Sequence, residues 1–217
     1  MATNKKVKVY ESLRQRIIDG QLRPGLPINE ADFARELSVS KTPVREALRQ
    51  LERDGFVENV PGRGSAISHI RPQDSREVLE VREILELGAA KRAAWQHGND
   101  ELHLKRENLR KLLAEEASQE SVREWGSWED VHVSIVKAAG NQTLLEMYRR
   151  LLDRNLRIYN CIGDRFTLRR LHEIHTEHAA VLDAILEGNV EGVEQAVQDH
   201  FRNAGKALMG IVGPERQ

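Results

Sequence analysis

The spacing of apolar residues changes once along this chain and then changes back, and this pattern limits the folds that the chain can adopt. From the N-terminus, apolar residues recur every three or four positions, as in amphipathic helices. Residues 56–60 and 66–70 instead have the pattern of strands, and residues 61–65 between them form a turn rich in Gly and Pro. Helical spacing resumes after Pro72 and continues to about residue 210. The sequence therefore predicts short helices and one hairpin, followed by an all-helical part.

Three short helical patterns precede the hairpin. The first stops at Gly20, the second spans about residues 29–37, and the third runs from about residue 41 to Gly55. A tight connector, residues 38–40, separates the second helix from the third. The third helix has apolar residues at i, i+3, i+4 and i+7, namely Val44, Ala47, Leu48 and Leu51. Three helices followed by a hairpin are the plan of a winged helix-turn-helix, which reads duplex DNA.

The face of the third helix opposite these apolar residues is basic. It carries Lys41, Thr42, Arg45 and Arg49, and the spacing of four residues places the three cations on one stripe. Arg63 lies at the tip of the hairpin between two glycines, where the backbone can approach DNA closely. The stripe alone is more typical of a solvated helix face. The hairpin and Arg63 together favour DNA binding.

Charge is distributed unevenly along the chain. Residues 1–71 hold 13 basic and 9 acidic side chains, a net charge of +4, whereas residues 72–217 carry a net charge of −5. A basic first part beside an acidic remainder is consistent with a polyanionic partner for the first part. We therefore expect a DNA-binding domain at residues 1–71 and a helical domain at residues 72–217.

The second part has six amphipathic patterns joined by short breaks. They span about residues 74–97, 99–118, 120–139, 142–162, 166–187 and 190–210. Short loops between helices are typical of antiparallel neighbours. The predicted fold class is thus mainly α, with a winged helix-turn-helix domain and an all-helical antiparallel bundle.

Three histidines lie on the inward stripes of three different bundle helices: His132, His178 and His200. Imidazole is a common ligand of zinc and nickel, and bundle interiors often hold metals. The pattern predicts a divalent metal such as Zn or Ni, with Glu129 or water completing its coordination. Glu129 precedes His132 by three residues and can reach the same face. The alternative is a metal-free pocket in which the histidines bind an anion.

Arg82 interrupts the apolar stripe of the first bundle helix, and a buried guanidinium requires a partner. It could form an ion pair, with Glu86 one turn on, or it could clamp the carboxylate of a ligand. Asn155 and Tyr159 face inward on their own helix. We expect them to line the same pocket.

Three stretches of the first part are recognisable. The residues ELSVSKTPVREAL at 36–48, LERDGFV at 51–57 and IIDGQLRPG at 17–25 closely resemble the GntR family of regulators. The resemblance extends over residues 9–70 and implies a winged helix-turn-helix that binds an inverted-repeat operator as a homodimer. It further implies that Ser40, Lys41, Thr42 and Arg45 contact DNA and that Gly62 contacts it at the wing. Ala31 stands where some relatives have arginine, so base preference is expected to differ.

The helical part resembles the FCD (FadR C-terminal domain) subgroup of the same family. The residues that carry this resemblance are Arg82, Glu86, His132, the AGN motif at 139–141, the Glu177-His178 pair and His200. The resemblance implies an effector-binding domain, and we expect dimerisation there as well. Its metal site usually includes an aspartate four residues before the first histidine, where this chain has Trp128. Release from DNA on effector binding is the outcome that the resemblance most often implies, hence a repressor.

The function that we expect is a ligand-responsive transcription regulator whose effector is a small organic acid. A metal-dependent hydrolase with a helical adaptor is the rival. It would need a positioned acid or base, and the chain has no HExxH motif. A purely structural helical adaptor would leave the hairpin unexplained. We therefore expect no enzymatic activity. The single cysteine, Cys161, fits a reducing compartment, and neither a secretory signal nor a membrane span is evident, so a cytoplasmic location is expected.

Overall fold

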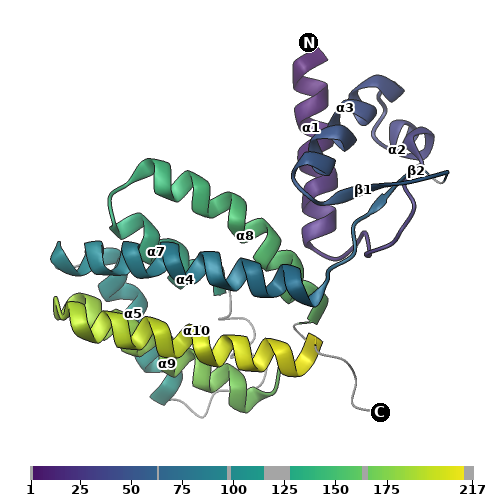
Figure 1. Cartoon of the computed structure of the whole chain (residues 1–217). Coiled ribbons are helices and arrows are strands. Elements are labelled where there is room, and N and C mark those ends of the chain that lie inside the picture. The colour runs from purple at the N-terminus through teal and green to yellow at the C-terminus, as the bar shows by residue number, and fades with distance from the viewer. Residues whose placement is uncertain (1, 63, 97–98, 115–127, 163–165, 213–217) are drawn as a thin grey trace. The chain divides into compact units, whose positions relative to one another are not determined.

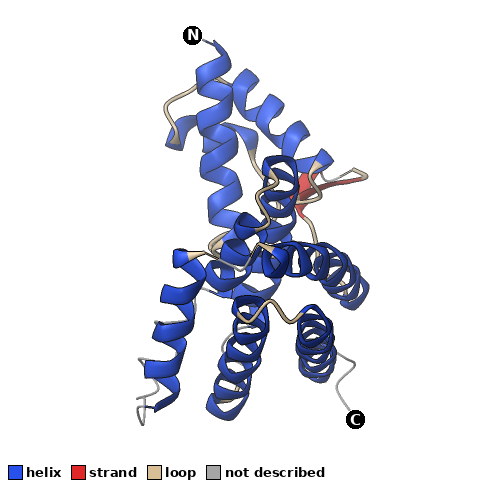
Figure 2. Cartoon of the chain, turned by 90° about the vertical axis from the view of Figure 1, so that its left-hand side faces the viewer, coloured by secondary structure: helices blue, strands red, loops and turns tan. Residues whose placement is uncertain are grey.

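The computed structural model describes residues 2–62, 64–96, 99–114, 128–162 and 166–212. The chain divides into two compact units. One comprises Met1–Arg71 with Leu156–Cys161, and the other comprises Pro72–Asn155 with Ile162–Gln217. Within the described ranges, strands occur only in the first unit (Figure 2). No helix in these ranges combines the length and the apolar character that crossing a membrane requires.

The first unit is a three-helix domain with a hairpin (Figure 1). Its elements are α1 (Ala2–Ile18), α2 (Glu30–Glu36), α3 (Lys41–Arg53), β1 (Val57–Val60) and β2 (Gly64–Ile67). All three helices and the hairpin contribute to one buried core, which includes Leu13, Ile17, Phe33, Val44, Leu48, Leu51, Phe56 and Ile67. The predicted winged helix-turn-helix is therefore confirmed.

The connection between α2 and α3 is the tight turn that the sequence predicts. Ser38 adopts a left-handed backbone conformation, with φ of 52°, which few residues other than glycine tolerate. The amide of Val39 then donates to the carbonyl of Ala34 at 2.9 Å, which closes the end of α2. Lys41 follows within two residues, so this turn sets where α3 begins.

The hairpin differs from the prediction in its second strand. β1 and β2 are antiparallel, with Val57 opposite Ile67 and Val60 opposite Gly64. Gly62 and Gly64 both have positive φ, so the chain reverses directly after Val60 and pairing resumes at Gly64. The strand therefore begins two residues earlier than expected, and its predicted continuation to Ile70 is wrong.

The second unit is an all-helical bundle, as predicted. Its described helices are α4 (Pro72–Trp95), α5 (Asp100–Ala114), α7 (Trp128–Ala138), α8 (Gln142–Ile162), α9 (Leu168–Leu186) and α10 (Val190–Val212). α4 packs against α7, α9 and α10, while α5 packs against α7 and α9. α4 begins at Pro72, because proline suits the first position of a helix. The predicted helices at 99–118 and 120–139 extend into residues 115–127, which lie outside the described ranges.

Candidate metal centre and nucleic-acid interface

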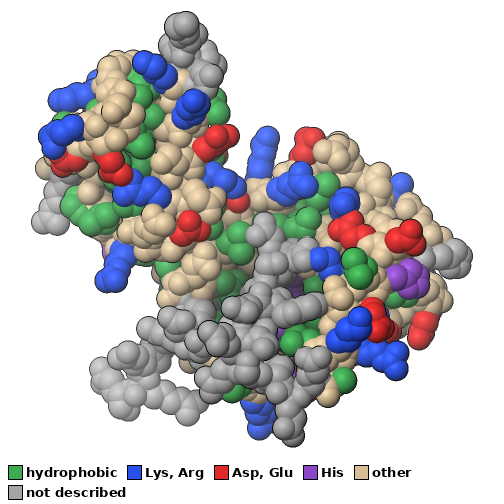
Figure 3. All heavy atoms as spheres, turned by 180° about the vertical axis from the view of Figure 1, so that it is seen from behind, with side chains coloured by type: hydrophobic (Ala, Val, Ile, Leu, Met, Phe, Trp, Pro, Cys, Tyr) green, Lys and Arg blue, Asp and Glu red, His purple; other side chains and the backbone are tan. Residues whose placement is uncertain are grey.

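The exposed face of α3 is the candidate DNA surface. Burial of Val44, Ala47, Leu48 and Leu51 fixes how α3 is rotated against the core. The residues predicted to meet DNA then lie exposed on α3 or at its start: Ser40, Lys41, Thr42, Arg45 and Arg49. Figure 3 shows Lys and Arg side chains distributed over the surface of this unit. Five of the seven residues predicted to meet DNA are thus exposed on one helix and its N-cap.

Arg45 is held by a carboxylate from the neighbouring helix. Its Nη2 donates to Glu30 Oε2 at 2.9 Å, and its Nε lies 3.2 Å from both carboxylate oxygens. These hydrogen bonds lower the pKa of Glu30, and the charges of Lys41 and Arg49 lower it further, whereas slight burial opposes them. Glu30 is therefore ionised at neutral pH and lies among the basic residues of this face.

The hairpin of β1 and β2 forms the wing of the domain, and the structure describes its turn only in part. Gly62 is exposed, has a φ of 74°, and has open space where a Cβ would stand. This leaves its backbone accessible to a partner. Arg63 lies outside the described residues, so its contact with DNA stays a prediction.

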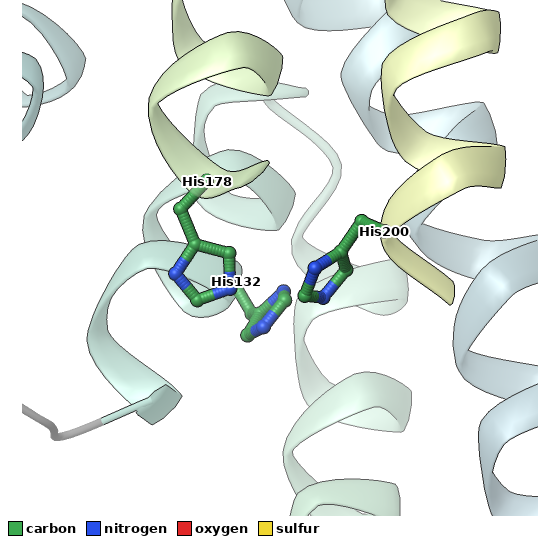
Figure 4. A group of neighbouring side chains, drawn as sticks. All are labelled: His132, His178 and His200. Carbon is green, nitrogen blue, oxygen red and sulfur yellow. The ribbon is translucent and has the colours of Figure 1, made fainter. Parts of the chain in front are cut away.

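The three predicted histidines converge inside the bundle. His132 comes from α7, His178 from α9 and His200 from α10, and all three side chains are buried. Figure 4 shows their rings pointing toward one another. One nitrogen from each ring lies within 4.8 Å of the others. Ring centroids are 4.7 Å apart for His132 and His178, and 4.8 Å apart for His178 and His200. This spacing allows one ion to contact all three rings.

Glu86 on α4 connects the histidine cluster to Arg82. Its Oε2 lies 2.6 Å from Nδ1 of His132, and its Oε1 accepts from Arg82 Nε at 2.9 Å and from the Tyr148 hydroxyl at 2.6 Å. Arg82 also donates through Nη1 to Asn155 Oδ1 at 3.0 Å. All five side chains are buried. The ion pair between Arg82 and Glu86, one of the two roles considered for Arg82, is therefore present.

The protonation states of this network follow from its geometry. Burial raises the pKa of Glu86, but the charge of Arg82 and the hydrogen bonds from His132 and Tyr148 outweigh it and leave the pKa at about 2. Burial lowers the pKa of His132 to about 4 and that of His178 well below its usual value. Because an ionised carboxylate can only accept, Nδ1 of His132 carries the ring proton. Its Nε2 then keeps a lone pair for a metal.

Glu177 on α9 repeats this arrangement at His200. Its Oε2 lies 2.9 Å from Nδ1 of His200, and its Oε1 accepts from Arg170 Nη1 at 2.7 Å and from Asn203 Nδ2 at 3.0 Å. Burial raises the pKa of Glu177, while the hydrogen bonds from His200 and Arg170 lower it more strongly, to about 2. Two of the three histidines are thus oriented by carboxylates through Nδ1, as is typical of metal-binding histidines. The residues present fit a divalent metal.

The remaining site predictions have mixed outcomes. Asn155 is buried beside Arg82, as expected. Tyr159 is half-buried and groups with the first unit, so its role in the pocket stays a prediction. Glu129 belongs to α7, but its side chain lies outside what the structure describes. His175, one turn before His178, is buried, with ring centroids 6.3 Å apart.

Tyr148 is a member of the site that the sequence reasoning did not single out. It precedes Asn155 by seven residues, so both lie on the same stripe of α8, and this spacing could have indicated it. Arg170 likewise precedes Glu177 by seven residues on α9, whereas Asn203 lies on another helix and had no such signal.

Comparisons with known proteins cover both units. Residues 5–67 match the model for bacterial regulatory proteins of the gntR family, and residues 77–203 match the FCD domain. The chain is 27% identical over 209 residues to the HTH-type transcriptional regulator YdhC of Bacillus subtilis, covering 95% of this chain and 92% of that one. It is 29% identical to LutR of the same organism, over 89% and 96% of the two chains. A solved GntR-type regulator from Rhodococcus sp. RHA1 shares the fold, with a TM-score of 0.72, 22% identity and coverage of 95% and 98%.

Proposed function

Because the chain belongs to the GntR family of bacterial regulatory proteins and carries an FCD domain, it is a transcription regulator, and we propose that it responds to a small carboxylate bound beside a divalent metal in its helical unit. Both halves of the chain match regulators, which favours this function over a metal-dependent hydrolase with a helical adaptor. Repression, with release from DNA on effector binding, is the direction that the family resemblance implies.

The histidine cluster is the observation that carries the effector proposal. His132, His178 and His200 would hold the metal, with Zn or Ni as the candidates because imidazole suits both. Burial keeps His132 and His178 neutral, and the nearby carboxylates Glu86 and Glu177 are already bonded to His132 and His200. A divalent ion on neutral imidazoles retains positive charge, which favours an anionic effector such as an organic acid.

Arg82 and Asn155 are the proposed contacts for the rest of the effector. Arg82 Nε is taken by Glu86, whereas Nη1 bonds the neutral amide of Asn155. An effector carboxylate could replace this amide as the acceptor without breaking the ion pair, and a charge-assisted hydrogen bond is the stronger of the two. Tyr159 is proposed as a further contact, and Glu129 or water as a further metal ligand.

The direct test of this function combines DNA selection with effector titration. The metal-loaded protein would be used to enrich duplexes from a random library, and the enriched duplex would be titrated in the presence of a panel of small organic acids. We expect an inverted repeat to be enriched and one acid to change its Kd about tenfold, a typical coupling between two sites. Enrichment of no duplex would contradict DNA recognition. A Kd that no acid changes would contradict the effector proposal.

Arg45→Ala tests the proposed base reading by α3. Because Arg45 is exposed on the proposed recognition face, its loss should reduce discrimination at one position of each half-site about tenfold or more. Arg63→Ala at the wing should instead weaken binding to all duplexes and lower the salt dependence. Fluorescence anisotropy at fixed salt measures both effects. Arg35→Ala is the control, since Arg35 is an exposed arginine on α2. Unchanged operator preference in Arg45→Ala would show that another element reads the bases.

An exposed apolar stripe on α4 supports the proposed homodimer. Val81, Ile84 and Trp95 are 44%, 71% and 69% exposed, and Gly88 between them has open space where a Cβ would stand. Successive members of this stripe, with Gly88 included, are three, four and seven residues apart, which places them on one helix face. A second copy packed there about a two-fold axis would cover this stripe, and two recognition helices would match an inverted repeat.

Ile84→Glu tests this interface, because it places a charge in the middle of the stripe without touching the core. We expect light scattering at micromolar concentration to show the mass of a monomer and operator affinity to fall, while metal content is unchanged. Leu104→Glu is the matched control, since Leu104 is a 61% exposed residue on α5. A dimeric Ile84→Glu protein would place the interface elsewhere.

A further inference from the structure

One carboxylate lies inside the basic face that is proposed to bind DNA. Glu30 is the first residue of α2, and it bonds both Nε and Nη2 of Arg45 on α3. The charges of Lys41 and Arg49 also act on it. Its negative charge stands among cations whose proposed partner is a polyanion, so it opposes association with phosphates.

Local stability does not account for this carboxylate. Asn29 already caps α2, since its Oδ1 accepts from the amide of Ala31 at 2.9 Å. Asp32 supplies a second acidic group in the same helical turn and bonds Arg35 at 3.2 Å. The ion pair between Glu30 and Arg45 is itself partly exposed, with 32% and 57% of the two side chains accessible, and such pairs stabilise a fold little.

The geometry of the pair instead constrains how Arg45 can meet a base. Two contacts to one carboxylate fix both the plane and the direction of the guanidinium. Glu30 bonds the edge of the guanidinium formed by Nε and Nη2, which leaves Nη1 and the second N–H of Nη2 for another acceptor. The edge formed by Nη1 and Nη2 can also bond two acceptors side by side, as O6 and N7 of guanine are in the major groove.

We propose that Glu30 is a specificity-determining residue that positions Arg45 for a guanine and disfavours binding to duplexes that lack one at that position. This inference rests on the proposed reading of DNA by α3. On the correct sequence, Arg45 bonds the carboxylate and the base together. On other sequences, Arg45 gains no base contact, and the charge of Glu30 still repels the nearby phosphates.

The experiment uses the full-length protein and two probes: a duplex enriched by the wild type from a random library, and an unrelated duplex of the same length. For Glu30→Gln and Glu30→Ala we expect affinity for the unrelated duplex to rise a few-fold, and the ratio between the two affinities to fall about tenfold. Asp32→Asn is the matched control, because it removes the same charge from the same turn of α2 without touching Arg45. It should leave the ratio unchanged. An equal fall in the affinity ratio of Asp32→Asn would show that net charge alone causes the effect, and it would overturn the proposal.

A double-mutant cycle separates positioning of Arg45 from a direct role of Glu30. In the Arg45→Ala background, Glu30→Ala should cause no further loss of discrimination, because the group that it positions is already absent. The same loss in both backgrounds would show that Glu30 acts independently and would overturn the proposal. Thermal melting followed by circular dichroism should be nearly unchanged in all variants, which separates specificity from folding.

The outcomes also distinguish this inference from the function on which it rests. A wild-type protein that enriches no duplex would overturn both the role of Glu30 and the proposed recognition of DNA. A wild-type protein that discriminates well, together with Glu30 variants that discriminate equally well, would overturn the role of Glu30 alone and leave DNA recognition by α3 in place.

Discussion

His178→Ala is expected to abolish stoichiometric metal binding while the protein remains folded. The three imidazoles supply every ligand assigned to the metal among the described side chains, and removal of one leaves two. Loss of a residue that hydrogen-bonds a metal ligand typically lowers metal affinity by roughly 10–100-fold. Because His178 is itself a proposed ligand, we expect a larger loss of affinity. Elemental analysis of the purified protein and competition with a chromophoric chelator measure this loss.

His172→Ala is the matched control for this experiment, because His172 is an exposed histidine on the same helix. It should retain the metal content and affinity of the wild type. If the wild type and His178→Ala carried equal amounts of metal, the cluster would not be a metal site. A metal-free wild type that bound organic acids through these histidines would instead support the anion pocket that the sequence left open.

Arg82→Met is expected to destabilise the metal-free protein by about 3–5 kcal/mol at neutral pH, a magnitude typical of breaking a buried ion pair. The reason is that Glu86 would stay buried against His132 and Tyr148 without its cation. Urea unfolding measures the change. Arg82→Met combined with Glu86→Leu should recover much of the loss, since no uncompensated charge is then buried. Additive losses in the double variant would show that the two side chains act independently.

The pair formed by Arg82 and Glu86 also predicts how the stability difference between the wild type and Arg82→Met depends on pH. In the wild type the pKa of Glu86 is about 2, below its ordinary value of 4.5, so the stabilisation is present above pH 4.5 and is lost as the pH falls toward 2. In Arg82→Met, burial raises the pKa of Glu86, and the penalty at neutral pH disappears as the carboxyl binds a proton. The difference in unfolding free energy between the two proteins should therefore narrow as the pH falls from 7. A difference that widens on acidification would contradict the assigned role of Arg82.

Periodicity along the chain determined which face of each helix is buried. The apolar spacing of Val44 and Leu48 was enough to place Arg45 and Arg49 on the exposed face of α3, because the rotation of a helix follows from its buried stripe. The same reasoning placed His132, His178 and His200 toward the bundle interior. Gly and Pro positions located most element boundaries. They did not locate the start of β2, which depends on how tightly the turn after Val60 closes.

The tertiary structure alone decided which inward and outward groups meet. Glu86 and His132 are 46 residues apart, Glu177 and His200 lie on different helices, and Glu30 reaches Arg45 across two elements. The apolar stripe shows which face of a helix is buried, but it does not fix the position of the helix along its axis or its crossing angle with a neighbour. A hydrogen bond depends on both to within a fraction of an ångström. The sequence by itself therefore determined the domain types, the basic face and the candidate ligands. Packing decided that carboxylates orient two of those ligands and hold the arginine proposed to read DNA.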